Sequence, residues 1–264
     1  GTAVIELDPV SHGLTTFGDN NDIIDGIWGI YKDTLSMYMV VNQIEKDDNG
    51  NIWVVNPFCE KFGNLLAVQS ADNETWSHVQ IPDSNSFRPQ IITFDQFNRA
   101  WLGFAYESNG DTLYSSGGIK VLQYSNLNFS DENDSTWFTI SNPKALPGDS
   151  QDGSVWSMVF DKMNFLWILN EKGIRAYEGY SYNRLNKTIT LNPFTVSDQD
   201  GNKIPYDFLS HISYAKGNRI RVDSQNNKWI ITHQGVWITD DGINFWPSEE
   251  GLHPDNSGLL SDIV

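Results

Sequence analysis

Short runs of alternating apolar and polar residues recur along the chain, and one motif punctuates them. An aspartate is followed three residues later by glycine or asparagine and six residues later by tryptophan; the copies are Asp47–Trp53, Asp95–Trp101, Asp161–Trp167 and Asp223–Trp229. An apolar residue stands three places before each aspartate, as strand alternation requires. The tryptophans lie 48, 66 and 62 residues apart. A repeat of this length with strand-like content is typical of a solenoid or a propeller.

Each motif predicts a strand, a tight turn and a second strand. The period-2 pattern places the end of a first strand at the aspartate and the start of a second strand at the tryptophan. The third position, Gly50, Asn98, Asn164 or Asn226, tolerates the positive φ of a tight turn. The aspartate can accept hydrogen bonds from turn amides, and the tryptophan N–H needs a partner. We interpret the motif as a hairpin staple and expect all four indole rings to be largely buried.

Two further strands follow in each repeat. Third strands are predicted at 65–69, 118–124, 173–177 and 235–239, and fourth, outer strands at 76–81, 137–140, 189–191 and, more weakly, 244–246. Four antiparallel strands per repeat form a propeller blade. No long apolar stripe of helical period occurs, so helices should be few. The predicted fold class is all-β, a β-propeller of four-stranded antiparallel blades.

The repeats predict the extent of each blade. A single propeller domain or arc is expected over 1–264, with blades at about 37–81, 88–140, 154–191 and 211–247. Residues 2–7 and 14–17 look like a third and a fourth strand, and 259–264 look like a first strand. We therefore expect about four complete blades, partial blades at 1–20 and 258–264, and an arc of a larger propeller. The exposed strand edges of such an arc invite pairing with another chain.

Composition narrows the possible partners. The net charge is −17, from 17 basic and 34 acidic residues, and phosphate binding needs a cationic surface, so no nucleic-acid partner is expected. No apolar run approaches the roughly 20 residues of a spanning helix, so no membrane insertion is expected within this chain. The single cysteine, Cys59, excludes an intrachain disulfide. We interpret Cys59 as a small buried apolar residue, with a reactive or ligating thiol as the alternative.

The search for reactive groups predicts no catalytic residue, no cofactor and no metal site. The five histidines stand in different repeats without a zinc or protease motif; they are His12, His78, His211, His233 and His253. Two acidic loops leave calcium open as an alternative. Loop 130–135 offers Asp131, Asn133 and Asp134, and loop 197–202 offers Asp198, Asp200 and Asn202. Neither is followed by the bidentate glutamate of a calcium loop, so ordinary solvated turns are favoured.

Longer stretches resemble a known family. The sequence D-x-x-G-x-x-W followed by G-I-x-x-Y resembles two-component regulator propeller repeats. The stretches "NIWVVNPF" 51–58, "LLAVQSADNETW" 65–76, "GGIKVLQYSNLNFSDENDSTWFTI" 117–140, "NNKWIITHQGVWITDDG" 226–242 and "NSGLLSDIV" 256–264 resemble the C-terminal propeller of PorZ-type proteins. The resemblance covers roughly residues 40–264. The segment 178–210 is longer and less regular than the family pattern.

The resemblance implies a non-enzymatic binding scaffold outside the cytoplasm. PorZ-type proteins are surface propellers of Bacteroidota that accompany the sortase complex of the type IX secretion system at the outer membrane. A protein partner at the cell surface or in the periplasm is expected, because sparse Lys and Arg disfavour an anionic glycan; a glycan stays the alternative. Two other functions remain open. One is the ligand-sensing propeller of a hybrid two-component receptor, and the other is a polysaccharide-active enzyme with paired acids at the channel mouth.

Overall fold

The structure, a computed structural model, describes the greater part of the chain. The described residues are 4–17, 40–57, 65–72, 75–82, 88–109, 112–129, 134–142, 146–149, 153–240, 244–247 and 251–259. Within these ranges the regular elements are β-strands, with no α-helix and one 3-10 turn, η3 (Pro147–Asp149). No helix in the described part of the chain is long and apolar enough to cross a membrane. The all-β class and the few helices were predicted correctly.

Four groups of antiparallel strands, the blades, correspond to the four repeats. The first blade consists of β3 (Gln43–Lys46), β4 (Ile52–Val55), β5 (Leu66–Gln69) and β6 (Trp76–Val79). The second consists of β7 (Arg88–Phe94), β8 (Ala100–Asn109), β10 (Ile119–Tyr124) and β11 (Ser135–Ile140). The third consists of β12 (Val155–Phe160), β13 (Leu166–Asn170), β14 (Gly173–Asn183) and β15 (Thr188–Pro193). The fourth contains β18 (Arg219–Val222), β19 (Lys228–Thr232) and β20 (Gly235–Thr239).

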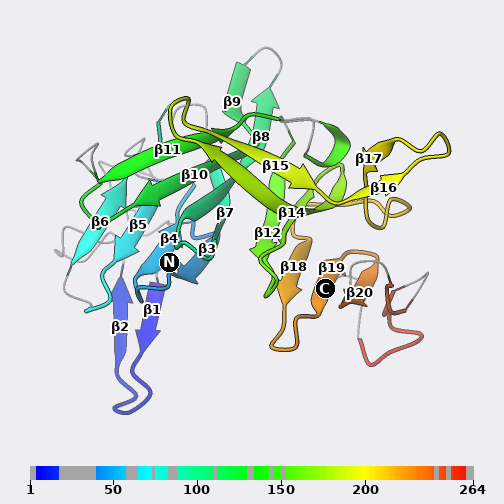
Figure 1. The fold of residues 1–264 in the computed structure, drawn as a ribbon. Helices are drawn as coiled ribbons and strands as arrows, with labels where there is room; N and C mark the ends of the chain where they lie inside the picture. Colours follow the sequence, from blue (N-terminus) through cyan, green and yellow to red (C-terminus); the bar gives the residue numbers. More distant parts are fainter. Residues whose placement is uncertain are drawn as a thin grey trace.

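The blades stand side by side in chain order. Figure 1 shows β3–β6 in blue and cyan on one side of the molecule and β18–β20 in orange on the other. The first strands of neighbouring blades contact one another, β3 with β7, β7 with β12, and β12 with β18. Each aspartate of the motif directly follows a first strand, and each tryptophan is the second residue of the next strand. The predicted strand–turn–strand units are therefore confirmed.

The apolar core lies between the blades. One cluster joins blades one and two and contains Trp53, Ile92 and Leu102. A second joins blades two and three around Trp101, and a third joins blades three and four around Trp167. A sheet that is apolar on both faces must bury both faces, and stacking blades face to face achieves this. The repeated tryptophan is thus a residue of the junction between two blades.

The third blade departs from the prediction because its third strand is longer. The strand β14 was expected to end at residue 177, but it continues to Asn183 and pairs with β15 in register Tyr182↔Ile189. Residues 179–183 keep the alternation of a strand, with half-buried Tyr180 and Tyr182 separated by exposed Ser181. The strand β15 also pairs in parallel with β11, which joins blades two and three in one nine-stranded sheet.

The fourth blade lacks a full outer strand within the described residues. The predicted strand at 244–246 is a single bridge between Ile238 and Trp246, with two backbone hydrogen bonds of 2.9 and 2.8 Å. Two hairpin elements were not predicted: β9 (Thr112–Ser116), which pairs with β8, and the pair β16 (Thr195–Ser197) and β17 (Lys203–Pro205). Both extend outward from the blades.

Partial blades were predicted at both ends of the chain, and the structure describes the strands of one of them. The strands expected at 2–7 and 14–17 correspond to an antiparallel hairpin of β1 (Val4–Leu7) and β2 (Leu14–Phe17). The strand expected at 259–264 lies outside the described residues apart from Leu259. The blade limits, the total number of blades and the open or closed form of the propeller stay predictions.

Candidate ligand-binding site

The repeated motif folds into the same turn each time. Its third position has positive φ in every copy: 90° at Gly50, 57° at Asn98, 62° at Asn164 and 71° at Asn226. One carboxylate oxygen of the aspartate accepts backbone N–H groups of the turn; Asp161 Oδ1, for example, accepts from Met163 and Phe165, both at 2.9 Å. These contacts confirm the predicted role of the aspartate.

The second carboxylate oxygen accepts the indole N–H of the same motif. The Nε1–Oδ2 distances are 3.0 Å for Trp53, 3.0 Å for Trp101, 3.3 Å for Trp167 and 2.9 Å for Trp229, each with the aspartate six residues earlier. Sequence reasoning missed this pairing, although the constant spacing of the two residues was the signal. The motif is therefore an Asp–Trp unit, a hydrogen-bonded pair held by its own turn.

The next blade completes the first Asp–Trp unit. The Tyr124 hydroxyl, from β10 of the second blade, donates to Asp47 Oδ2 at 2.8 Å, and its ring lies 5.1 Å from that of Trp53. Burial alone raises the pKa of Asp47, but hydrogen bonds from Asn51, Trp53 and Tyr124 outweigh it and hold the pKa below its ordinary value. With the Tyr124 ring of the second blade packed against it, Trp53 is fully buried.

The third Asp–Trp unit uses a lysine from the next blade. In the other copies the residue four places after the aspartate donates to Oδ2, namely Asn51, Arg99 and Asn227. The third copy has Phe165 there, which offers no side-chain donor. Lys228 of β19 places its Nζ 3.0 Å from Asp161 Oδ2, and both side chains are almost fully buried. The fourth blade thus supplies the donor that the third motif lacks.

The fourth Asp–Trp unit corrects the expectation that all four rings are buried. Trp53, Trp101 and Trp167 are at most 2% exposed, but Trp229 is 37% exposed. Its local geometry is unchanged, because Asp223 still accepts from Trp229 and Asn227. The difference is that the described residues place no sheet over this ring. Burial of the tryptophan therefore depends on the next blade and not on the motif.

A hollow opens at the turn end of the junction between blades two and three. It has a volume of about 510 Å³ and is lined by Phe97, Arg99, Gln123, Tyr124, Tyr180, Tyr182 and Arg184. The first two residues lie in the second motif, the next two at the end of β10, and the tyrosines on the long part of β14. The wall of the hollow that contains Tyr180 and Tyr182 therefore exists because β14 is longer than predicted.

We call this hollow the Arg–Tyr hollow. Arg99, whose side chain is mostly buried, is the residue in its lining with the most contacts to the other lining residues described below. Its Nε donates to Asp95 Oδ2 at 2.7 Å and its Nη2 donates to the Tyr180 hydroxyl at 3.2 Å. Its guanidinium carbon lies 3.8 Å from the centre of the Tyr182 ring and 4.7 Å from that of Phe97. Such stacking holds the guanidinium flat, and Asp95 offsets its charge. The remaining N–H groups of Arg99 are oriented by these contacts before any ligand arrives.

The phenols of the hollow are hydrogen-bond donors at neutral pH. Burial, followed by the charge of Asp95, raises the pKa of Tyr180 to about 12. Burial also raises the pKa of Tyr182, whose hydroxyl is buried and has no hydrogen-bond partner among the described residues. A buried polar atom without a partner is costly, and a ligand with an acceptor atom could satisfy it.

The rim of the hollow carries a second cation and an exposed ring. Arg184 is exposed and makes no ion pair within the described residues, while Phe97 is 64% exposed. The residues that line the hollow in the described part of the chain include no carboxylate, imidazole or thiol. Two arginines and four aromatic rings are suited to holding an acceptor-bearing group. Sequence reasoning missed this site, because its two walls come from segments about 80 residues apart.

The two acidic loops are the places where the sequence left calcium binding open as an alternative. Asp198 forms the same turn as the Asp–Trp units, with its Oδ1 accepting from Asp200 and Asn202 at 2.9 and 2.8 Å. Its oxygens are therefore engaged by the turn. Asp131 and Asn133 of the other loop, and Cys59, lie outside the described residues. Among the described residues no three metal-binding side chains gather, the histidines included.

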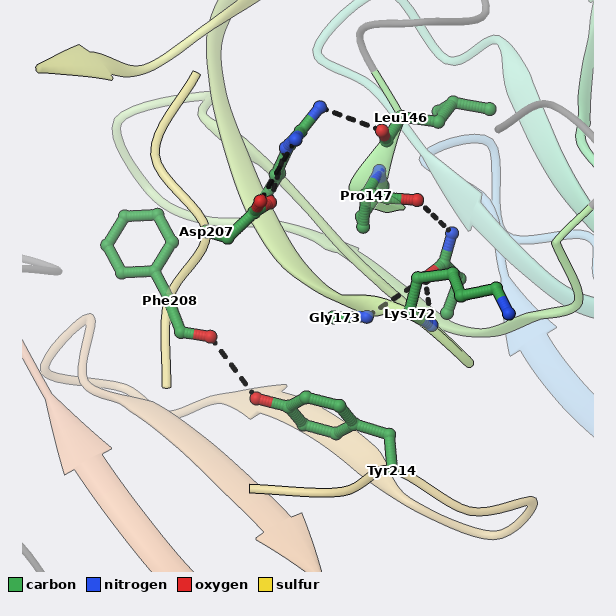
Figure 2. A network of polar contacts seen from close by, with 9 residues as sticks. Leu146, Pro147, Lys172, Gly173, Asp207, Phe208 and Tyr214 are labelled. Carbon is green, nitrogen blue, oxygen red and sulfur yellow. Dashed lines mark hydrogen bonds and ion pairs between the residues drawn. The ribbon is translucent and has the colours of Figure 1, made fainter. Parts of the chain in front are cut away.

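A second polar cluster, at the other end of the third blade, is structural. Arg175 is 4% exposed and binds Asp207 at 2.5 Å and the Leu146 carbonyl at 2.8 Å. Figure 2 shows these contacts beside the Pro147 carbonyl, which accepts from Asn170 at 3.0 Å. The segments containing Leu146 and Asp207 precede and follow the third blade. Arg175 thus ties both connecting segments to β14, and its donors are used within the fold.

Comparison with known proteins shows a shared fold. No protein-family model matches the chain, and no curated protein matches it in sequence. The solved structure of PorZ, an essential bacterial surface component of the type-IX secretion system of Porphyromonas gingivalis, superposes with a TM-score of 0.63 at 18% identity. The match covers 94% of this chain and 31% of PorZ, so this chain spans about a third of that protein's length.

Two further solved structures match less closely. Virginiamycin B lyase from Staphylococcus aureus has a TM-score of 0.44 at 12% identity, over 78% of this chain and 54% of that one. YCF48 from Cyanidioschyzon merolae has a TM-score of 0.46 at 13% identity, over 93% and 61%. The expected likeness to PorZ is confirmed at the level of the fold: over nearly its whole length, this chain is built like part of PorZ.

Proposed function

We propose that this chain is a non-enzymatic, extracytoplasmic scaffold that binds an acidic segment of a protein partner in the Arg–Tyr hollow. The observation that carries the proposal is the lining of the hollow, in which Arg99 and Arg184 stand among four aromatic rings. Arginine and tyrosine are enriched at the centres of protein interfaces, where a few residues account for most of the affinity. A carboxylate between the two arginines gains charge-assisted hydrogen bonds.

The non-enzymatic part of the proposal is supported by the chemistry of the lining. The raised pKa values of Tyr180 and Tyr182 keep both phenols protonated near neutral pH, so neither is in the phenolate form that could accept a proton from a ligand. Arg99 is paired with Asp95, which lies 3% exposed behind the arginine and the indole of Trp101. Groups held in this way can orient a ligand, but they offer no obvious proton acceptor to it.

The extracytoplasmic setting is supported by the shared fold. PorZ is a bacterial surface component of the type-IX secretion system, and a propeller of the same build suits an accessory of a surface complex. Because fold alone does not determine function, the experiment must test binding at the Arg–Tyr hollow itself. We place this chain at the cell surface or in the periplasm on these grounds, with a protein as its partner.

Binding of short peptides tests the proposal. The peptide Ac-Asp-Phe-Asp-NH2 should bind at least about fivefold more tightly than Ac-Asn-Phe-Asn-NH2, because only the first offers carboxylates to the arginines. The Arg184→Gln variant should remove this preference without changing the melting temperature, since Arg184 is exposed. Lys187→Gln, an exposed cation of the same β14–β15 hairpin that does not line the hollow, is the matched control.

Two outcomes contradict the proposal. Equal affinity for both peptides in the parent protein means that charge does not guide binding. Stronger binding of D-glucose or D-glucuronate than of the acidic peptide assigns the hollow to a glycan instead of a protein segment.

A further inference from the structure

An exposed aromatic ring stands at the rim of the Arg–Tyr hollow. Phe97 is the residue two places after the aspartate of the second motif, and its side chain lines the hollow while 64% exposed. The same position is Asn49 in the first motif and Gln225 in the fourth, so the turn does not require an apolar residue there. In the third motif it is Met163, which does not line the hollow. The phenylalanine is therefore kept in water for a reason outside the folding of its turn.

Contacts within the site hold Phe97 in place. Its backbone N–H donates to Asp95 Oδ1 at 3.0 Å, so the turn fixes the start of the side chain. The Arg99 guanidinium carbon lies over the Phe97 ring, 4.7 Å from its centre, and 3.8 Å from the centre of the Tyr182 ring. The exposed fraction of Phe97 shows that the rest of its ring is open to solvent. A ring that is already held loses little conformational entropy when a ligand packs on it.

The hollow is larger than a carboxylate needs. Its volume of about 510 Å³ lies within the range of sites that enclose small organic ligands, about 300–1,000 Å³. A carboxylate that reaches the two arginines would fill only part of this space. Apart from these arginines and Gln123, the lining consists of four aromatic residues. Such a lining is suited to an apolar ring, because aromatic rings attract one another in offset-stacked and edge-to-face contacts.

The third blade also places an exposed apolar side chain next to a cation of the hollow. Arg184 lines the hollow from the turn between β14 and β15, and the next residue, Leu185, is 92% exposed. Arg99 and Phe97 are the corresponding pair on the second blade. Both blades lie between other described blades, so these exposed side chains belong to an interior junction. Exposed apolar side chains beside polar ones are typical of interaction sites.

We propose that the acidic segment bound in the Arg–Tyr hollow carries an aromatic side chain within two residues of its carboxylate, and that this ring packs against Phe97. The inference rests on the proposed function and names the chemical class of the partner segment. The carboxylate accepts hydrogen bonds from the arginines, and the ring removes Phe97 and part of the lining from water. A site that rewards both groups together selects an aromatic–acidic segment over a segment with only one of them.

A double-mutant cycle between the protein and a peptide tests this contact. The peptides are Ac-Asp-Phe-Asp-NH2 and Ac-Asp-Ala-Asp-NH2, which differ only in the ring and place a carboxylate on each side of it. The parent protein should bind the phenylalanine peptide at least about fivefold more tightly. In Phe97→Ser this preference should vanish, while the affinity for the alanine peptide should stay within about twofold of the parent value. NMR titration measures each dissociation constant.

The matched control is Met163→Ser. Met163 has the same motif position in the third blade, is 70% exposed and does not line the hollow, so this variant should keep the fivefold preference. In both variants the backbone N–H that donates to the motif aspartate is retained, and both side chains are exposed. Unchanged melting temperatures should therefore show that both variants fold.

Four results overturn the inference. Equal affinity of the parent protein for the two peptides means that no ring is recognised, and a preserved preference for Ac-Asp-Phe-Asp-NH2 over Ac-Asn-Phe-Asn-NH2 then leaves the proposed function standing. A preference for phenylalanine that survives in Phe97→Ser places the ring elsewhere. An equal loss of affinity for both peptides in Phe97→Ser shows that Phe97 only positions Arg99. Binding of neither peptide contradicts the proposed function as well.

Discussion

The first three Asp–Trp units and the fourth have the same local geometry but different surroundings. In all four, the indole N–H donates to the aspartate six residues earlier. The first three are then covered by the next blade, which adds Tyr124, Tyr180 or Lys228 to the carboxylate. The fourth has no such cover within the described residues. The motif therefore fixes a turn, and the neighbouring sheet decides whether that turn is part of a core.

The covered junctions also differ from one another. Asn98 Oδ1 accepts the backbone N–H of Asp48 at 3.0 Å, and Asn226 Oδ1 accepts that of Lys162 at 2.7 Å, so the turns of neighbouring blades are joined there. The equivalent Asn164 Oδ1 is buried without a partner among the described residues. This is the junction where the Arg–Tyr hollow opens. A junction that lacks one ordinary contact and holds two arginines is better suited to binding than to stability.

The largest expected effect separates the covered from the open tryptophan. Trp101→Ala should lower the free energy of unfolding by about 3–5 kcal/mol, because it empties a buried site and removes one of the donors to the Asp95 carboxylate. Trp229→Ala should cost no more than about 2 kcal/mol, since that ring is already partly in water. Urea unfolding of both variants measures the difference. Equal losses would show that the next blade adds nothing to the unit.

A slightly smaller effect is expected at the third unit. Lys228→Met should destabilise the protein by about 3 kcal/mol, because it leaves the buried Asp161 carboxylate without its cation. In a Phe165→Asn background the same change should cost less, since asparagine there can donate to Asp161 as Asn51 does to Asp47. A double-mutant cycle by urea unfolding tests this coupling. If the losses of unfolding free energy from Lys228→Met and Phe165→Asn simply add, an asparagine at position 165 does not replace Lys228 as the donor to Asp161.

The comparison also shows how far the sequence predicts the molecule. Most of the strands, the turns and the role of each aspartate follow from residues within ten positions of one another, and these predictions are confirmed; the outer strand predicted at 244–246 is only a bridge. The extension of β14 was missed because Tyr180 and Tyr182 were read as part of an irregular segment. The exposure of Trp229 was missed because burial depends on a neighbouring sheet. The Arg–Tyr hollow could not be predicted, since Arg99 and Arg184 meet only when two blades pack.

A still smaller effect is expected on the stability of the protein at acidic pH. The pKa of Asp47 is lowered in the folded protein, so its contribution to stability is fully present above the unfolded pKa of about 3.9 and is lost as the pH falls through the folded value. Asp47→Asn should therefore flatten the dependence of the unfolding free energy on pH between about 5 and 3. Hydrogen bonds from Trp229 and Asn227 also lower the pKa of Asp223, but Asp223→Asn should flatten the dependence less, because solvent screens this partly exposed carboxylate. A larger effect at Asp223 than at Asp47 would contradict the importance of cover by the next blade.

The most direct test of the account is a titration of the protein, labelled with ¹⁵N, by Ac-Asp-Phe-Asp-NH2. The claim is that the second junction binds while the third one only holds blades together. The indole N–H signal of Trp101 and the Nε–H signal of Arg99, which share Asp95, should shift in proportion to the bound fraction. The indole signal of Trp167, whose partners Asp161 and Lys228 do not line the hollow, should stay in place. Shifts at Trp167 without shifts at Trp101 and Arg99, or no shifts at millimolar peptide, would contradict binding in the Arg–Tyr hollow.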